Sequence, residues 1–322
     1  MKPLKRRVGS ALYTTSGSIA TIPLPRNYNY RKLICRISGS VVVTGGTGAG
    51  APHVRAAYKA ISRVELIANG RDTIWSVPAE IIQMLNIIDY GCVPSASHPG
   101  NDTAATYTFN GSFIIDLAVM RAIRPIDTLF PAAALSTLDL KITWGAGADM
   151  FTGAVDFTSA AIQTTTELVV EAFEEIGTVP GGVGVNKISE INRTLTGANT
   201  RYQVQLATGN TYKGFLIYTN VDNVPVDTML DGVSVESGTE VYQSWLTNDE
   251  LLNYNKLAYS LETQLVGIHN VDFLDSDGFL TEILDARRLS NLDLFLNVAL
   301  PAGTTRSLIV YPQELILPEK AA

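Results

Sequence analysis

The strongest local signal in the sequence is Ile61-Ser62-Arg63-Val64-Glu65-Leu66-Ile67-Ala68-Asn69-Gly70-Arg71. Its Asn69-Gly70 pair stands between two extended runs, and both central residues of a type I′ turn need positive φ, which Asn and Gly tolerate. The sequence therefore predicts a β-hairpin over residues 64–75.

A helix is expected directly after this hairpin. Apolar residues recur there at intervals of three and four, Pro78 fits the first helical turn, and Gly91 is a typical stop. The predicted helix therefore covers residues 77–90. Its apolar residues are Val77, Ile81, Ile82, Leu85 and Ile88.

The remaining apolar segments are mostly short, rich in β-branched and aromatic residues, and separated by Gly, Asn, Asp or Pro. This pattern is typical of strands, so we predict an all-β fold. The expected strands of the first half are 18–24, 32–43, 106–119, 135–144 and 167–175.

The second half of the chain repeats the order of the first, and the match predicts a duplicated domain. The offset between matched segments falls from 183 to 168, 154 and 140 residues along the chain, which indicates the same elements joined by shorter loops. The matched segments are 18–24 with 201–206, 30–38 with 212–219, Asn69-Gly70 with Ser237-Gly238, Trp75 with Trp245, 136–144 with 290–298, and 167–170 with 307–310.

The second copy carries its own helix start signal, Thr247-Asn248-Asp249-Glu250. Thr247 and Glu250 form a predicted capping box, in which each side chain bonds a backbone N–H that the helix leaves without a partner. The glycine-rich residues 179–186 suit a linker between the copies. We therefore predict a basic arm at 1–10, a first β-sandwich at 11–177, a linker at 178–187, a second β-sandwich at 188–318 and a tail at 319–322.

The composition excludes disorder and indicates a weakly charged surface. Hydrophobic residues make up 46% and charged residues 17% of the 322 residues, against about 25% charged residues in an average soluble domain. Such a surface suits a protein that buries its outside against copies of itself. The start is unlike a signal peptide and no run of 18 apolar residues occurs, so we expect a soluble protein in a reducing compartment.

No motif predicts an active site, a cofactor or a metal centre. The histidines His53, His98 and His269 are far apart, and Cys35 with Cys92 gives neither a disulfide framework nor a metal spacing. Residues 44–50 are glycine-rich but lack the ending of a phosphate loop, so we interpret them as a flexible loop.

Residues 272–278 resemble a calcium loop only superficially. Aligning Gly278 with the turn glycine of an EF-hand places Phe273 and Leu284 where carboxylates are required. A structural cation at Asp272, Asp275 or Asp277 stays open, with a simple acidic turn as the alternative.

Basic residues are concentrated near the N-terminus. Residues 1–64 contain eleven Lys or Arg and no acid, whereas the rest holds 13 bases and 31 acids, a charge of −18. Two interpretations stay open: an anionic partner, or basic strands that neutralise acidic ones within the fold. The candidates for a membrane or nucleic-acid contact are Lys2, Lys5, Arg6 and Arg7, with a solvated tail as the alternative.

The duplicated plan resembles a family of viral coat proteins. Two β-sandwich domains, each with a helix after a central hairpin and without catalytic motifs, are similar to the double jelly-roll major capsid proteins of tailless, internal-membrane-containing icosahedral bacteriophages, corticovirus-like or finnlakevirus-like. Residues 61–71, with Ile22-Pro23-Leu24-Pro25 and Tyr30 upstream, resemble the first jelly roll of the corticovirus type. The resemblance implies two tandem eight-stranded jelly-roll β-sandwiches.

The resemblance also implies an assembly without enzymatic activity or cofactor. Homotrimers of pseudo-hexagonal outline would tile an icosahedral virion, with loops 91–105 and 145–165 as an outer tower and the basic N-terminus facing the internal lipid membrane. The implied partners are further copies, penton or minor capsid proteins and that membrane, without sequence-specific nucleic acid. The virion would assemble in the host cytoplasm.

Two other classes of protein stay as alternatives. A double jelly-roll glycan amidase would place acids between its domains, but such proteins are secreted and bear disulfides, traits that this sequence lacks. A viral spike or carbohydrate-binding module needs an aromatic platform, which the 13 scattered tyrosines do not reveal.

Overall fold

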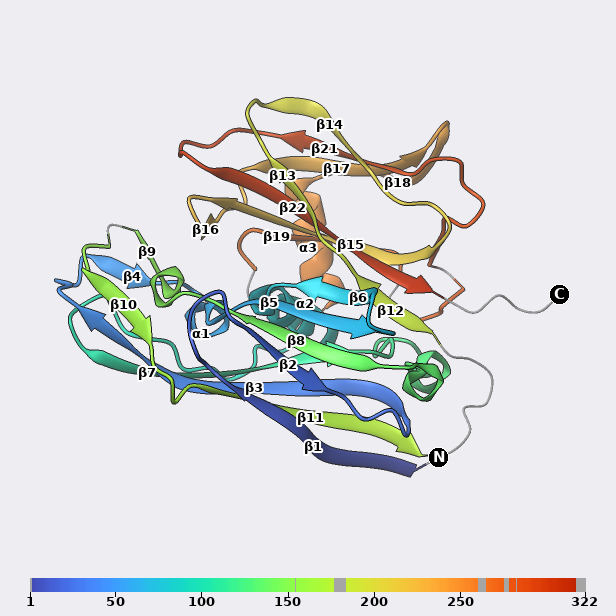
Figure 1. Cartoon of the computed structure of the whole chain (residues 1–322). Coiled ribbons are helices and arrows are strands. Elements are labelled where there is room, and N and C mark those ends of the chain that lie inside the picture. The colour runs from blue at the N-terminus through green and yellow to red at the C-terminus, as the bar shows by residue number, and fades with distance from the viewer. Residues whose placement is uncertain are drawn as a thin grey trace. The chain divides into compact units, whose positions relative to one another are not determined.

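The computed structural model describes residues 2–153, 155–176, 184–259, 265–274, 278–281 and 283–316. Strands dominate the chain (Figure 1), which confirms the predicted all-β class. The chain divides into two compact units, each described separately below. The first unit comprises Met1–Ile87, Cys92–Val119 and Pro125–Val185, and the second comprises Ile88–Gly91, Met120–Arg124 and Asn186–Ala322.

The first unit contains two main antiparallel sheets and a short two-stranded sheet of β4 and β9. One follows the order β1-β11-β3-β7, with β10 on the part of β3 beyond β11, and the other follows β2-β8-β5-β6. The bounds are β1 (Lys2–Leu12), β2 (Ile19–Pro23), β3 (Asn29–Thr44), β4 (Gly50–Pro52), α1 (Ala56–Lys59), β5 (Ile61–Ala68), β6 (Asp72–Val77), α2 (Ala79–Tyr90), β7 (Thr106–Asp116), η1 (Pro125–Thr128), η2 (Ala132–Ala134), β8 (Leu138–Trp144), η3 (Gly147–Met150), β9 (Phe151–Gly153), β10 (Ser159–Ile162) and β11 (Glu167–Ile176).

The second unit also contains two antiparallel sheets. One follows β13-β22-β15-β19, with short strands β16 and β20 on β15, and the other follows β14-β21-β17-β18. The bounds are β12 (Val185–Ile188), β13 (Ile191–Thr194), β14 (Asn199–Gln205), β15 (Thr211–Val221), β16 (Val224–Pro225), β17 (Leu230–Ser237), β18 (Glu240–Thr247), α3 (Asn248–Ala258), β19 (Ile268–Asp272), β20 (Leu284–Asp285), β21 (Asp293–Val298) and β22 (Arg306–Ile316).

The two units share one strand plan. Reading along the chain, the eight strands that make up the two orders of the first unit match those of the second in the same sequence, which confirms the predicted duplication of an eight-stranded sandwich. In the second unit, Val204 and Leu294 from one sheet pack with Phe215 and Val310 from the other in a single hydrophobic core. The two layers of this unit are visible in Figure 1.

Equivalent hydrogen bonds fix the alignment of the two copies. The Leu24 N–H donates to Leu138 O at 2.8 Å, and the Leu206 N–H donates to Leu292 O at 2.9 Å. Six residues later in each copy, a buried tyrosine hydroxyl donates to a carbonyl five residues upstream, Tyr30 to Pro25 and Tyr212 to Ala207. These tyrosines therefore have the same role in both units.

The predicted hairpin and helices are confirmed. β5 and β6 flank Asn69 and Gly70, whose φ angles of 53° and 73° are those of a type I′ turn. α2 follows β6, and α3 follows β18 with the predicted capping box between Thr247 and Glu250.

The predicted match of Trp75 with Trp245 is wrong, because Trp75 pairs with Leu66, and the corresponding Val235 pairs with Gln243. Val77 pairs with Val64 in the first unit and Leu246 pairs with Val233 in the second, so Leu246 takes the place of Val77. Because successive strand residues face opposite sides, this slip sends Trp245 outward. Trp75 is 2% exposed and Trp245 is 41% exposed.

Two predicted boundaries also change. Residues 2–10, predicted as an arm outside the first sandwich, belong to β1 and pair with β11 along its length. The predicted loop 145–165 contains β9 and β10, and β10 completes the pairing of β3. Most of the predicted linker, at 178–183, and the predicted tail at 319–322 lie outside the described residues.

Candidate functional site

The basic residues that were predicted to contact an anionic partner lie on strand β1. Arg6 forms a two-point ion pair with Glu174 on β11, with Nε to Oε2 at 2.6 Å and Nη2 to Oε1 at 2.9 Å. The Glu174 side chain is fully buried, so its charge depends on this partner. The hydrogen bond to Glu174 raises the pKa of Arg6.

Lys5, Arg7 and Arg36 of β1 and β3 also contact carboxylates on β11. Glu171 bonds Arg36 at 2.6 Å and Lys5 at 3.2 Å, and Glu167 bonds Arg7 at 2.9 Å. The hydrogen bond from Arg36 lowers the pKa of Glu171. The strand β11 is therefore an acidic strand between two basic ones.

This charge ladder agrees with one of the two interpretations of the N-terminal charge. Arg6, Arg7 and Lys5 neutralise acids within the fold, whereas Lys2 at the start of β1 is exposed. The acids had a recognisable signal, because Glu167, Glu171 and Glu174 share one predicted strand. Contact with an anionic partner stays a prediction.

The glycine-rich segment predicted as a flexible loop is tied to a buried carboxylate. Asp102 is buried; its Oδ1 accepts from the Gly50 N–H at 2.8 Å and its Oδ2 from the Asp156 N–H at 3.1 Å. Asp156 in turn accepts from the Thr47 N–H at 3.0 Å. A Cβ on Gly46 would lie 1.6 Å from the Asp102 carbonyl oxygen, so the segment needs glycine for close packing. No sequence motif pointed to Asp102.

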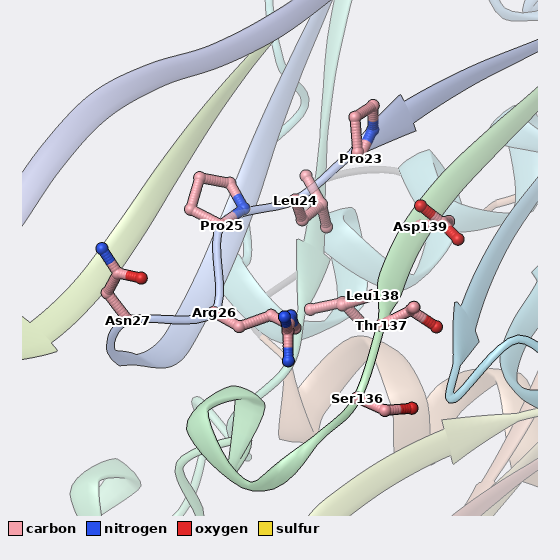
Figure 2. Close-up of a pocket in the computed structure, with 9 residues that line it drawn as sticks. All are labelled: Pro23, Leu24, Pro25, Arg26, Asn27, Ser136, Thr137, Leu138 and Asp139. Atoms are coloured by element: carbon pink, nitrogen blue, oxygen red, sulfur yellow. The ribbon is translucent and has the colours of Figure 1, made fainter.

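An open groove of about 570 Å³ lies where β2 ends and β8 begins (Figure 2). Leu24 and Leu138 are buried at its base, and Figure 2 shows the Arg26 side chain reaching toward Leu138. Arg26 donates to the Leu135 carbonyl, and the Ser136 hydroxyl donates to Asn69 Oδ1 at 3.1 Å. This groove thus holds a serine bonded to an amide rather than to a base.

The other chemically reactive side chains are dispersed. Among the described residues, no three His, Cys, Asp or Glu side chains gather as a metal site would require. Cys35 is buried and Cys92 is exposed, both as free thiols. No helix within the described ranges is long and apolar enough to cross a membrane.

Asp272, one of three candidate cation ligands, is bonded to an arginine instead. Its Oδ2 lies 2.6 Å from Arg121 Nη1 and accepts from the Tyr259 hydroxyl, and the Arg121 guanidinium stacks 4.7 Å from the Tyr259 ring centre. Burial and the Asp272 charge raise the pKa of Tyr259. Sequence reasoning missed this cluster of the second unit, and Asp275 and Asp277 lie outside the described residues.

The comparisons with known proteins rest on structure alone. No protein-family model and no curated protein matches the sequence. The chain superposes on the major capsid protein of Sulfolobus Turreted Icosahedral Virus with a TM-score of 0.78 at 16% identity, covering 99% of this chain and 98% of that one. Major capsid protein P2 of bacteriophage PM2 gives 0.66 at 11% identity, covering all of both chains.

A third structure, from the PBCV-1 virus capsid, gives a TM-score of 0.64 at 11% identity over 98% of this chain. Each of these three matches covers at least 98% of the chain. The chain has the double jelly-roll fold. The first unit is therefore the first jelly roll and the second unit is the second, and β2, β5, β6 and β8 form one sheet of the former.

Proposed function

We propose that this chain is a viral major capsid protein, a structural protein that forms homotrimeric, pseudo-hexagonal capsomers tiling an icosahedral shell over an internal membrane. The observation that carries the proposal is the strand-for-strand duplication of one jelly roll within the chain. Three chains then supply six similar domains, so a threefold assembly presents a nearly sixfold outline. The solved structures matched over the full chain are capsid proteins.

The weakly charged composition supports burial between copies. Charged residues make up 17% of the chain, and interfaces between permanently associated subunits are depleted in charge. Further copies are the main partner under this proposal, and penton or minor capsid proteins would close the shell, which would assemble in the host cytoplasm.

The test of the assembly is its mass and outline in solution. Light scattering of the purified chain is expected to give about 104 kDa, three times the 34.7 kDa of one chain, and electron microscopy is expected to show hexagonal particles. A chain that stays monomeric at concentrations used for assembly would contradict the proposal.

The internal membrane is proposed as the partner of Lys2, Lys5, Arg6 and Arg7. Each cation near an anionic lipid surface contributes about 1 kcal/mol of attraction. The exposed Lys2 offers its charge directly, whereas the others are shared with the acids of β11.

Deleting the whole basic segment is a poor test, because it removes the partner of the buried Glu174. The double variant Lys2→Gln and Lys5→Gln keeps Arg6 in place and is expected to weaken flotation with phosphatidylglycerol vesicles at low salt. Phosphatidylcholine vesicles serve as the control. Equal flotation of variant and unaltered protein would reject the membrane contact.

A further inference from the structure

Three side chains of the second unit bring together an amine, a carboxylate and a carboxamide. Lys187 on β12 places its Nζ 3.3 Å from Oε1 and 3.5 Å from Oε2 of Glu314 on β22. Asn210, in the segment before β15, donates a hydrogen bond from its Nδ2 to the same Oε2. One carboxylate therefore contacts both a possible nucleophile and the nitrogen of an amide.

The carboxylate at the centre of this triad is buried. Glu314 is 3% exposed, whereas the Lys187 side chain is 30% exposed, so the site also opens to solvent. Attraction within an ion pair offsets the cost of burying a charge only when the geometry is good, and 3.3 and 3.5 Å are long for such a pair. Passing one proton from the ammonium to the carboxylate leaves a neutral amine, which is the nucleophilic form of lysine.

The backbone holds the carboxamide in place beside the carboxylate. The Gly209 N–H donates to Ala286 O, and the Ala286 N–H donates to Asn210 O, both at 3.0 Å. Two residues after Asn210, the buried Tyr212 pairs with Glu314 across the sheet. Groups that are held next to each other react with a smaller entropic cost than free groups.

The first jelly roll keeps the carboxylate but changes both of its partners. Glu174 and Glu314 occupy equivalent register positions, each opposite the paired tyrosine of its copy. Glu174 is held by Arg6, whose guanidinium stays protonated and is not a nucleophile. Tyr28 takes the place of Asn210, two residues before that tyrosine. The reactive set therefore belongs to the second copy.

We propose that Lys187 and Asn210 join in an intramolecular isopeptide bond, with Glu314 as the proton carrier. Glu314 takes a proton from the Lys187 ammonium, and the neutral Nζ adds to Cγ of Asn210. Glu314 then gives its proton to Nδ2, the Cγ–Nδ2 bond breaks, and Nζ releases a second proton to the carboxylate. An Nζ–Cγ amide remains, and ammonia leaves with this last proton as ammonium. The reaction needs neither an oxidant nor a reductant.

The bond ties β12, at the start of the second unit, to the segment that leads into β15. Such a crosslink stabilises a fold mainly by restricting the unfolded chain. Because the bond forms within one chain, the inference goes beyond the proposed function and does not depend on it.

Intact mass spectrometry of the purified, denatured chain tests the inference directly. The mass is expected to fall short of the sequence mass by one ammonia molecule. Trypsin, which cuts after Lys and Arg, should fail to cut at Lys187 and should yield a branched peptide that joins residues 142–193 to residues 202–213. A full sequence mass, with residues 188–193 released as a separate peptide, overturns the inference.

Three variants assign the roles of the side chains. Lys187→Arg keeps a cation beside Glu314 but lacks the amine, and Glu314→Gln lacks the proton carrier, so neither is expected to lose ammonia or to give the branched peptide. Lys59→Arg is the matched control, because Lys59 also forms an ion pair with a buried glutamate, Glu80, at 2.7 Å. This control should keep both signals. A loss of ammonia that persists in Lys187→Arg overturns the inference, and the mass of the unaltered chain decides the question even if a variant does not fold.

Discussion

The first jelly roll buries its helix α2 within the chain, whereas the second leaves one face of its helix α3 exposed. Both copies have the same strand order and the same registers at the Leu24 and Leu206 hydrogen bonds. Their charge differs by seven units, with the whole excess of acids in the second copy. The two copies therefore share the core formed by their paired strands and differ in the exposure of the helix and in surface charge.

The strongest way to break the equivalence is to truncate the same core position in both copies. Leu140 pairs with Ile22, and Leu294 pairs with Val204 at the corresponding register, and both leucines are fully buried. We expect Leu140→Ala and Leu294→Ala each to lower the free energy of unfolding by about 3 kcal/mol. Urea unfolding at one fixed protein concentration measures both. A large cost in only one copy would show that the cores are not equivalent.

The next effect depends on pH and concerns the second copy alone. His269 pairs with Ile217, and the corresponding residue opposite Cys35 in the first copy is Phe113. His269 is fully buried beside Thr219, and burial lowers its pKa from 6.5 to about 3. The folded state therefore favours neutral histidine, and this stability is present above pH 6.5 and is lost as the pH falls toward 3.

The expected loss from this histidine is about 1.4 kcal/mol per pH unit below 6.5, or about 2 kcal/mol at pH 5. His269→Phe, which installs the residue of the first copy, should reduce this acid sensitivity, as should His269→Gln, which keeps a donor for Thr219. Thermal melting at pH 7.5 and pH 5 compares the three proteins. If the melting temperatures of both variants fall between pH 7.5 and pH 5 as much as that of the unaltered protein, groups other than His269 cause the acid sensitivity.

A smaller and symmetric effect is expected at the paired tyrosines. Tyr30 and Tyr212 each donate a hydroxyl hydrogen bond to a carbonyl five residues upstream. Tyr30→Phe and Tyr212→Phe should each cost about 1 kcal/mol of unfolding free energy, because each removes the hydrogen bond that a buried tyrosine makes to the backbone. Chemical denaturation measures the unfolding free energy of both variants. Unequal losses would show that the two tyrosines do not have the same role in the two copies.

The smallest effect is expected at the start of α3. Thr247→Ala removes the capping box and should cost about 0.5 kcal/mol, at the low end for a cap because Thr247 is exposed. Thr247→Ser keeps the hydroxyl and serves as the control. Far-UV circular dichroism with thermal melting measures both, and equal stability of the two variants would show that packing alone holds the helix.

Local signals in the sequence predicted the local structure well. The Asn69-Gly70 turn, the helix after it and the Thr247 cap depend on residues close together in the chain, and all three were predictable. The Trp75–Trp245 match failed because the β17–β18 pairing contains two register shifts, and each shift changes which face the following strand residues occupy. Identical residues in the sequence do not reveal such shifts.

The long-range contacts were harder to predict. Arg6 with Glu174, and Arg121 with Asp272, join residues more than 150 positions apart, and no spacing rule connects them. One of the two interpretations of the N-terminal charge was that basic strands neutralise acidic ones within the fold. The Arg6–Glu174 ion pair is of this type, but the sequence did not identify these two residues as partners. The fold of the chain was thus predictable from its repeat, whereas the surfaces that would carry its function depend on tertiary placement.

The pairing of β1 with β11 has a consequence for biosynthesis. Lys2 pairs with Ile176, so the first sheet cannot be completed until residue 176 has left the ribosome. From then on the first jelly roll has all eight strands, while the strands of the second have yet to emerge from the ribosome. Domains that fold in turn during synthesis expose less unpaired sheet edge at any moment. Because β1 pairs with β11, the first domain can complete its fold only after residue 176 has emerged from the ribosome.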